Sequence, residues 1–202
     1  MRTCDHVECI LFPCLDVQQQ YYVVPNVDLD PGKISLVLIS EAAPANPGDY
    51  YYAAGEPLFQ QTTLQAFQDA GVKVSSFYEI LEMGVYLTTA VKCAKKGYGL
   101  QTSTIEECSR LLEAELALFP NVQAYLLMGD VAIKAVNTIA RRSGQPRVIP
   151  AGPTYKLRGQ AFFFHGKPAF PSYLQAGPSF FIEKSKRKMI AEDIASALSL
   201  VK

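Results

Sequence analysis

The sequence predicts an α/β protein with three layers, in which helices cover both faces of a mostly parallel sheet. Short apolar runs rich in branched side chains alternate along the chain with stretches that repeat apolar residues at helical spacing. A strand, a helix and a second strand in succession form a right-handed crossover, which pairs the strands in parallel. The chain has 202 residues, 49% of them hydrophobic, so it can enclose one sizeable core, and we expect a single domain over residues 1–202.

The first half of the chain predicts two strands with a loop and a helix between them. Residues 34–40 form a short apolar run, which favours a buried strand. Residues 41–57 contain three prolines and two glycines, so we expect this segment to be irregular. A helix is expected at residues 62–70, and a second apolar run at residues 85–91 predicts the next strand.

The second half predicts a longer alternation of helices and strands. A capping box, Thr104-x-x-Glu107, opens an amphipathic helix over residues 104–119, and Pro120 ends it. The other elements expected in this half are a strand at 122–128, a helix at 130–142, strands at 162–165 and 168–173 joined by a Gly166-Lys167 turn, and a last helix at 182–200.

Composition and charge argue against a membrane protein, a secreted protein and binding of nucleic acid through overall charge. No apolar run approaches the roughly 20 residues that span a bilayer, and the first residues lack the pattern of a secretory signal, so we expect a cytoplasmic protein without a membrane partner. Lysine plus arginine and aspartate plus glutamate both total 19, so no overall field attracts a polyanion. Nucleic-acid binding would need a local patch such as residues 183–188, EKSKRK, which fits a solvated helix face equally well.

The expected topology indicates where a functional site would lie. In open parallel sheets, ligands bind at the carboxyl ends of the strands. In this chain that rule points to the loops that begin at Glu41, Ala90, Gly129 and Tyr173.

Four segments occur in an order that resembles a known family. They are LVLISEAAP (36–44), TTAVKC (88–93) with the helix TIEECSRLLEAEL (104–116), YLLMGDVAIKAV (125–136), and KLRG (156–159) with FPSY (170–173). These segments resemble the iron-sulfur branch of the uracil-DNA glycosylase superfamily found in bacteria and archaea. The resemblance implies a central sheet of four strands and an N-glycosidase that acts on DNA.

The resemblance also assigns roles at the expected base pocket. It implies that Glu41 orients a water molecule or stabilises the cationic sugar, and that the backbone of Ala42 and Ala43 approaches the base. The family asparagine that reads the base falls on Thr89, and the family histidine falls on Leu174 or within an insertion. These two departures leave the target base, and even the presence of turnover, open.

Aromatic residues of the long loop are candidates for holding an extrahelical base. Phe59 lies where the family has a stacking phenylalanine, although Leu58 aligns equally well and Phe59 could instead hold the following helix in place. Tyr52 and its neighbours Tyr50 and Tyr51 could narrow the pocket. We expect at least one of the three tyrosines to face a ligand or partner.

Other side chains could assist the leaving base or contact DNA. Because Leu174 cannot donate a hydrogen bond, another donor is needed, and the candidates are Ser172, Ser179, Gln175 or a backbone N–H. The expected DNA contacts are Arg158, Pro178, Ser179, Lys184, Lys186 and Arg187, with Phe180 or Phe181 as a wedge unless they pack the last helix.

Five cysteines predict a metal site or free thiols rather than disulfides. The resemblance places Cys93 and Cys108 on two ligands of the family's [4Fe-4S] cluster, and we choose Cys9 and Cys14 as the other two, with Cys4 as the spare. Zinc, or no metal, is the alternative. A cluster would fix the N-terminal segment, residues 1–30, onto the domain.

We therefore expect a base-excision N-glycosidase that removes a deaminated or damaged base from damaged or single-stranded DNA. The alternative is a module of the same fold that binds a nucleic acid or nucleotide without cleaving it. A thiol-based or iron-sulfur sensor is a more remote interpretation, and the oligomeric state is left open.

Overall fold

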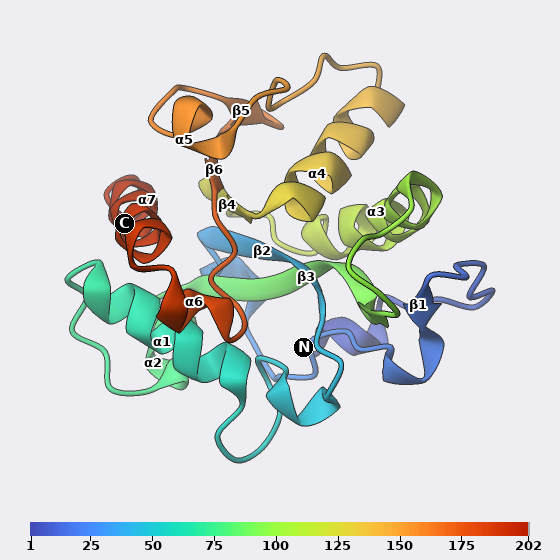
Figure 1. Ribbon diagram of the computed structural model, residues 1–202, viewed down its shortest axis with the longest axis horizontal. Coiled ribbons are helices and arrows are strands. Elements are labelled where there is room, and N and C mark those ends of the chain that lie inside the picture. Colours follow the sequence, from blue (N-terminus) through green and yellow to red (C-terminus); the bar gives the residue numbers. More distant parts are fainter. Residues whose placement is uncertain (202) are drawn as a thin grey trace.

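The computed structural model describes residues 1–201 as a mixed α/β fold around a curled six-stranded sheet (Figure 1). Its strands are β1 (Val17–Gln18), β2 (Leu36–Ala43), β3 (Val85–Lys95), β4 (Ala124–Met128), β5 (Phe163–Phe164) and β6 (Lys167–Ser172). They lie in the order β1-β3-β2-β4-β6-β5. The four inner strands pair in parallel, whereas β1 and β5 pair antiparallel to their neighbours at the two edges.

The expected number of four strands is wrong, because two further strands of two residues each extend the sheet at its edges. On one edge, Val17 from the cysteine-bearing segment pairs with Lys95 at the end of β3. On the other edge, β5 returns as β6 through a tight turn, in which His165 and Gly166 have φ angles of 49° and 73°. The expected hairpin at this point is present.

The helices follow the expected order with some differences in length. They are α1 (Leu58–Asp69), α2 (Phe77–Glu82), α3 (Thr102–Leu116), α4 (Asp130–Arg142), α5 (Thr154–Leu157), α6 (Ser179–Ile182) and α7 (Lys184–Leu198), with 3₁₀ turns η1 (Thr3–Asp5), η2 (Gln19–Tyr21), η3 (Pro31–Lys33) and η4 (Pro47–Asp49). The expected last helix corresponds to α7, and the short helix α6 before it is separated from it at Glu183, whose ψ angle is 73°. The short helix α2 is an addition to the expected elements.

Two hydrophobic clusters form the core, and both include residues of β2. Val37 and Ile39 belong to a cluster with the inner faces of α3 and α4. Leu36 and Leu38 belong to the other cluster, with α1, α2 and α7. Because successive residues of a strand point to opposite sides, β2 is buried on both faces, which explains its continuous apolar run. Figure 1 shows α3 and α4 on the opposite side of the sheet from α1 and α7.

The N-terminal segment packs on the edge of the domain next to β3. Val7, Val17 and Val24 are buried. The N–H of Val23 donates a hydrogen bond of 2.8 Å to the carbonyl of Lys92. Among residues 1–201, no helix combines the length and apolar character needed to cross a bilayer.

A buried polar network joins β3 to α3. Lys92 and Glu115 are both fully buried and form an ion pair. The hydroxyls of Tyr86 and Thr88 donate to Glu115 at 2.7 and 2.8 Å, and the Lys92 ammonium also donates to the Thr88 hydroxyl and to the Thr89 carbonyl. The hydroxyls of Tyr86 and Thr3 are also hydrogen bonded. These partners compensate the high cost of removing two charges from water.

Candidate active site

The carboxyl ends of β2, β3, β4 and β6 meet at one edge of the sheet, and Glu41 lies there. Its carboxylate Oε2 accepts a hydrogen bond of 2.7 Å from the ammonium of Lys95, at the end of β3. The two side chains keep 17% and 26% of their surface exposed, so the pair is shielded but open to solvent on one side. The Glu41 carboxylate is therefore held in place at this edge and keeps some access to solvent.

Gly129 brings the Glu41 carboxylate close to the start of α4. Its φ angle is 99°, a region that L side chains rarely adopt. A Cβ at this position would lie 2.6 Å from Oε1 of Glu41, so a side chain here would collide with the carboxylate. The partial positive charge at the N-terminus of α4 favours the negative charge of Glu41.

Ser172 is linked to the same edge, but its hydroxyl is committed to a buried neighbour. The carbonyl of Ser172 accepts a hydrogen bond of 3.0 Å from the N–H of Gly129. Its hydroxyl donates to Asp193 in α7 at 2.5 Å, and Arg158 binds the same carboxyl at 2.8 and 3.1 Å. Burial raises the pKa of Asp193, while Arg158 and Ser172 act in the opposite direction. Arg158 also binds Glu192, so the structure places it in an internal network.

A second group of polar side chains lies on the other side of β2. The hydroxyls of Ser40 and Tyr51 form a short hydrogen bond, and Gln175, which follows β6, donates to the Tyr51 hydroxyl at 2.8 Å. Thr89 pairs with Ser40 in the sheet register and is fully buried. Within the described residues, Oγ1 of Thr89, the hydroxyl of Tyr50 and Oε1 of Gln175 are buried without a hydrogen-bond partner. Such atoms are rare in native proteins, and these three lie in the interior between β2, β3 and the long loop.

The three tyrosines of the long loop form an aromatic cluster with Phe59 and Phe77. Tyr50 and Tyr51 are buried, with 3% and 0% of their surface exposed, and the hydroxyl of Tyr52 bonds the backbone of Leu87 in β3. The ring of Tyr51 lies 5.2 Å from that of Phe59 and stacks on Phe77 at 6.1 Å. Burial raises the pKa of all three tyrosines, so their hydroxyls stay protonated. This cluster fills the space between β2 and α1.

The remaining residues expected at the base pocket lie near these groups. Ala42 and Ala43 are buried at the end of β2, where a register shift against β3 bends the strand. Leu174 is half-buried and packs against the second cluster, next to Gln175. Its apolar side chain supplies no hydrogen bond to a base.

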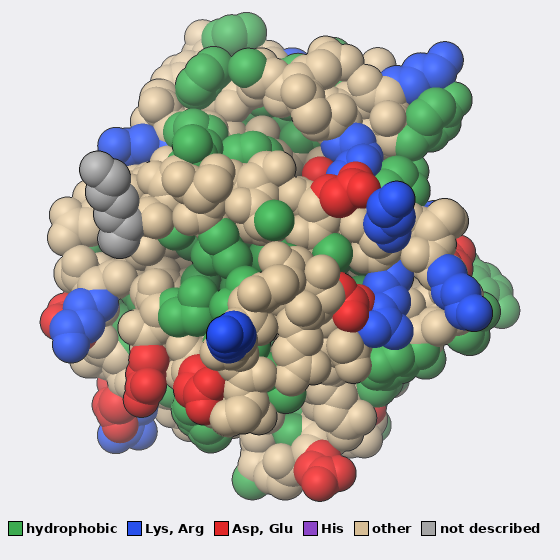
Figure 2. All heavy atoms as spheres, turned by 90° about the vertical axis from the view of Figure 1, so that its left-hand side faces the viewer, with side chains coloured by type: hydrophobic (Ala, Val, Ile, Leu, Met, Phe, Trp, Pro, Cys, Tyr) green, Lys and Arg blue, Asp and Glu red, His purple; other side chains and the backbone are tan. Residues whose placement is uncertain are grey.

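The expected DNA-contacting residues after Leu174 divide into free and paired groups. Pro178 and Ser179 are exposed at the start of α6, and Lys184 is exposed at the start of α7. Lys186 pairs with Glu183 at 2.8 Å, and Arg187 is bound to Asp69. Figure 2 views the face formed by α1 and α7, where lysine and arginine side chains alternate with acids. Two of the four cations of the expected basic segment are therefore paired with acids, whereas Lys184 and Lys188 are exposed and form no ion pair within the described residues.

Cys93 lies in β3 and Cys108 in α3, and Cys9 and Cys14 of the N-terminal segment lie near enough to influence them. Burial, together with the charges of Cys108, Cys9 and Cys14, raises the pKa of the Cys93 thiol to about 12. Burial also raises the pKa of Cys108 to about 11, with further contributions from Cys14 and Cys9. Cys4 instead contacts Asn26 and Asp5. A hollow of about 250 Å³ is lined by Cys9, Cys14 and Cys108 among other residues.

Within residues 1–201, no three histidine, cysteine or acidic side chains are close enough to hold a single metal ion. The four thiols are therefore not gathered at one point, and Cys93 is not among the residues that line the hollow. All five cysteines are free.

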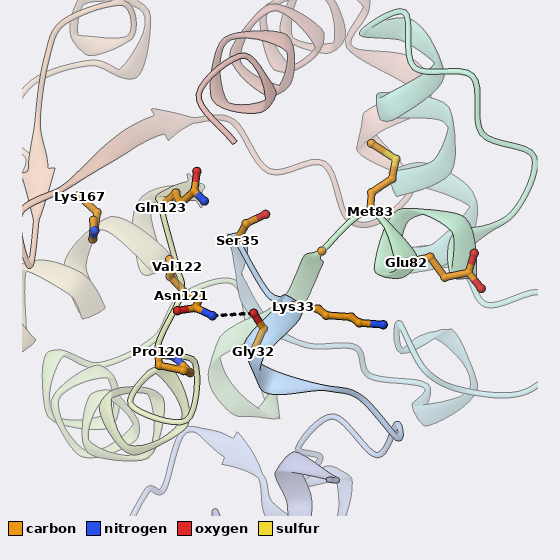
Figure 3. Close-up of a pocket in the computed structure, with 11 residues that line it drawn as sticks. Gly32, Lys33, Ser35, Glu82, Met83, Pro120, Asn121, Val122, Gln123 and Lys167 are labelled. Atoms are coloured by element: carbon orange, nitrogen blue, oxygen red, sulfur yellow. Dashed lines mark hydrogen bonds between the residues drawn. The ribbon is translucent and has the colours of Figure 1, made fainter. Parts of the chain in front are cut away.

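A larger hollow lies at the opposite edge of the sheet, away from Glu41 (Figure 3). It has a volume of about 590 Å³ and is lined by residues at the amino ends of the strands, including Ser35, Gly84 and Gln123. Asn121 spans one wall by donating a hydrogen bond of 2.8 Å to the carbonyl of Gly32. Ligands of parallel sheets bind at the other edge, so we assign no catalytic role to this hollow.

Two residues of the site are absent from the sequence-based expectation. Lys95 lies four residues beyond the expected end of its strand. Extending that strand through Lys92 and Cys93 would have placed Lys95 at its carboxyl end. Asp193 is a buried acid on the apolar face of α7, between Ile190 and Ile194, and this position in the helical repeat marks it as a partner for a buried cation or donor.

Comparisons with known proteins identify one family. The family described as "Uracil DNA glycosylase superfamily" matches residues 28–193. A "Type-5 uracil-DNA glycosylase" of Thermus thermophilus is 40% identical over 53 residues, which span 26% of this chain and 24% of that protein. The match thus covers about a quarter of the curated relative's length.

Two solved structures of a UNG protein from Nitratifractor salsuginis are also similar. The wild-type structure is 14% identical with a TM-score of 0.41, covering 91% of this chain and 82% of that chain. The structure of a point mutant of the same protein is 13% identical with a TM-score of 0.37, covering 93% of this chain and 89% of that chain. Since the family match extends from residue 28 to residue 193, well over half of the sequence, the chain belongs to the uracil-DNA glycosylase superfamily.

Proposed function

We propose that the protein is a base-excision N-glycosidase that removes a deaminated or damaged base from DNA, with Glu41 as the catalytic carboxylate. One observation carries this proposal: Glu41 stands at the carboxyl edge of the sheet, paired with Lys95 and packed against Gly129 at the start of α4. Membership of a superfamily of DNA glycosylases supports it.

Cleavage of the N-glycosidic bond develops positive charge on the sugar and negative charge on the leaving base. Lys95 and the N-terminus of α4 place positive charge beside Glu41 and hold its side chain. The carboxylate can stabilise the cationic sugar and accept a proton from the attacking water. Lys95 is the positioning residue for this carboxylate.

The leaving base needs a hydrogen-bond donor on the other side of β2. The Ser172 hydroxyl is committed to Asp193 and the Gln175 amide donates to Tyr51, which leaves Ser179 or a backbone N–H of the candidates named from the sequence. The unpartnered groups of Thr89, Tyr50 and Gln175 supply the polar surroundings that a base edge requires. Thr89 offers one rotating hydroxyl in place of an amide, so we expect discrimination between bases to be weaker.

A panel of oligonucleotides tests the proposal. Single-stranded and duplex substrates carrying uracil, hypoxanthine, xanthine or an oxidised base would be incubated with protein, and abasic sites would be detected by alkaline cleavage. We expect product from at least one substrate, lost in Glu41→Gln and retained in Glu82→Gln, which changes an exposed acid at the opposite edge. Absence of product from every substrate with folded protein would contradict the proposal.

The second candidate function is a module that binds nucleic acid without cleaving it. Leu174 at the position of a charge-stabilising donor favours it. This function predicts salt-sensitive binding to oligonucleotides that survives Glu41→Gln, together with no abasic product in the panel. Failure to bind at low salt would eliminate it.

We also propose that Cys9, Cys14, Cys93 and Cys108 hold a [4Fe-4S] cluster, with zinc or no metal as the alternative. The support for this proposal is that Cys93 and Cys108 fall on two ligand positions of the resembling family, and that Cys9, Cys14 and Cys108 line one hollow while Cys4 lies apart. Four thiolates suit a [4Fe-4S] cluster or a zinc ion. The bound cluster would supply structural support, joining the N-terminal segment to β3 and α3.

Anaerobic purification followed by iron, zinc and sulfide analysis tests the metal proposal. We expect iron and sulfide in equal amounts, lost in Cys93→Ser and Cys108→Ser and retained in Cys4→Ser. Zinc alone, or no metal in any preparation, would overturn it.

We also propose a cytoplasmic location. All five cysteines are free of disulfides, and free thiols persist in a reducing compartment.

A further inference from the structure

We infer that the tip of the loop between β3 and α3, Gly97-Tyr98-Gly99, is a second DNA-contacting element, on which Tyr98 stacks against an unpaired base. The inference rests on the proposed function, because it assumes that the protein acts on DNA. It adds an interaction surface that lies apart from the expected basic segment of α7.

Tyr98 is fully exposed, with a relative accessible surface of 107%. Its neighbours Gly97 and Gly99 lie in open space, since a Cβ at either position would meet nothing within 4 Å. A large aromatic ring gains nothing for the fold in this position, because it buries no surface. An exposed ring with both faces accessible is suited to stacking on a base.

The tip is short and is held firmly at both ends by one residue. The carbonyl of Asp16 accepts a hydrogen bond of 3.0 Å from the N–H of Lys96, and the Asp16 carboxylate accepts one of 2.6 Å from the N–H of Gln101. The hydroxyl of Thr104, in the first turn of α3, also donates to this carboxylate. Only residues 97–100 project beyond these contacts, so Tyr98 is presented from a fixed base.

The tip also lies at the edge of the sheet that carries the candidate catalytic group. Lys95, three residues before Tyr98, binds the Glu41 carboxylate at 2.7 Å. Lys96 is exposed and uses one donor on the carbonyl of Leu15 at 2.7 Å, which leaves two donors for a phosphate. The exposed side chain of Leu15 adds apolar surface beside the tip.

The chemistry of this surface favours nucleic acid over other macromolecules. It combines an aromatic ring, an exposed ammonium with two unused donors and a small apolar area, which match a base face and its phosphates. A single strand, or a strand from which a base has been extruded, offers an unstacked base beside Glu41.

Binding of a short fluorescein-labelled single-stranded oligonucleotide, measured by fluorescence anisotropy, tests the inference. We expect Tyr98→Ala to weaken binding by about 5- to 100-fold, the range typical of losing one base–aromatic stack. Tyr98→Phe should bind like the wild type, because it keeps the ring. Tyr78→Ala, which removes a tyrosine that is 57% exposed on α2, should also bind like the wild type.

The same oligonucleotide with 2-aminopurine in place of one base reports stacking directly. We expect the wild type and Tyr98→Phe to quench its fluorescence, and Tyr98→Ala to lose the quenching. Equal binding and quenching by wild type and Tyr98→Ala would overturn the inference and leave the proposed function intact. Weak binding by Tyr98→Phe would also overturn it, since the hydroxyl would then be the contact. No binding by the wild type at low salt would overturn both.

Discussion

A single carboxylate packed against a single glycine defines the most constrained point of the site. Gly129 combines a positive φ angle with a neighbour, Oε1 of Glu41, that leaves no room for a side chain. The backbone conformation and the position of the carboxylate therefore depend on each other. This dependence separates Gly129 from other glycines of the chain that have a positive φ angle but open surroundings.

Replacing Gly129 by alanine should reduce both stability and activity. We expect a loss of about 1–3 kcal/mol in the free energy of unfolding from the strained backbone, and a displaced Glu41 that lowers turnover at least tenfold. Urea denaturation and the excision assay measure the two effects.

Gly159→Ala is the matched control for that change. Its φ angle is 81°, but an added Cβ meets nothing within 4 Å. It should lose stability through strain alone and keep its activity. Equal losses of activity in the two variants would show that contact with Glu41 is irrelevant.

At the scale of elements, β3 and α3 are joined by buried charge rather than by apolar contacts alone. Lys92 and Glu115 form an ion pair without access to solvent, and each has further hydrogen-bond partners. Breaking such a pair is more costly than replacing both members, because one charge is then left without compensation.

Lys92→Met should therefore destabilise the fold by about 3–5 kcal/mol, and the double variant Lys92→Met, Glu115→Leu should recover part of the loss. Chemical denaturation of the two single variants and the double variant gives the coupling free energy. Additive losses would mean that the ion pair does not contribute as a unit.

The loop between these two elements should respond to acid through Asp16. Burial acts to raise the pKa of Asp16, but hydrogen bonds from Thr104 and the Gln101 N–H lower it below the ordinary value of 3.8. The stability that Asp16 contributes is thus present at pH values above 3.8. It is lost as the pH falls through the lower pKa of the folded state. Asp16→Asn should cost about 1 kcal/mol near neutral pH and flatten the acid limb of the stability curve. An unchanged acid limb in urea titrations would argue against this role.

Helices and strands long enough to show a hydrophobic repeat were predictable from the sequence, and shorter elements were not. The strands expected at residues 34–40 and 122–128 and the helix at 104–119 lie within a few residues of β2, β4 and α3. The six residues of α2 hold less than two turns, too few for a periodic signal. The burial of Tyr51 depends on Gln175, a contact far apart in sequence that no local pattern encodes. The sheet edge that carries Glu41 was predictable from the order of strands and helices. Its partner Lys95 was not, because that contact also joins residues far apart in sequence.

At the scale of the whole molecule, balanced charge limits how strongly DNA can be held by its phosphates. The 19 cations equal the 19 acids, and several cations near α7 are bound to acids of the same chain. Association with DNA should therefore depend on a few phosphate contacts and on stacking.

This balance predicts a shallow dependence of DNA affinity on salt. With two to four phosphates neutralised, the slope of log affinity against log salt should be about −2 to −4. Lys96→Ala should reduce its magnitude by about one unit for duplex DNA, whereas Lys156→Ala, on α5, should leave it unchanged. A slope as steep as that of a typical repressor would indicate a basic surface elsewhere.

The length of β3 has a consequence for how this sequence can change. Its eleven residues include Lys92, Cys93 and Lys95, of which Lys92 pairs with the buried Glu115 and Lys95 with Glu41. Because side chains alternate along a strand, inserting or deleting one residue would reverse the facing of every position beyond it. Changes in chain length should therefore be excluded from Val85–Lys95, whereas the loop past its end has no sheet register to keep.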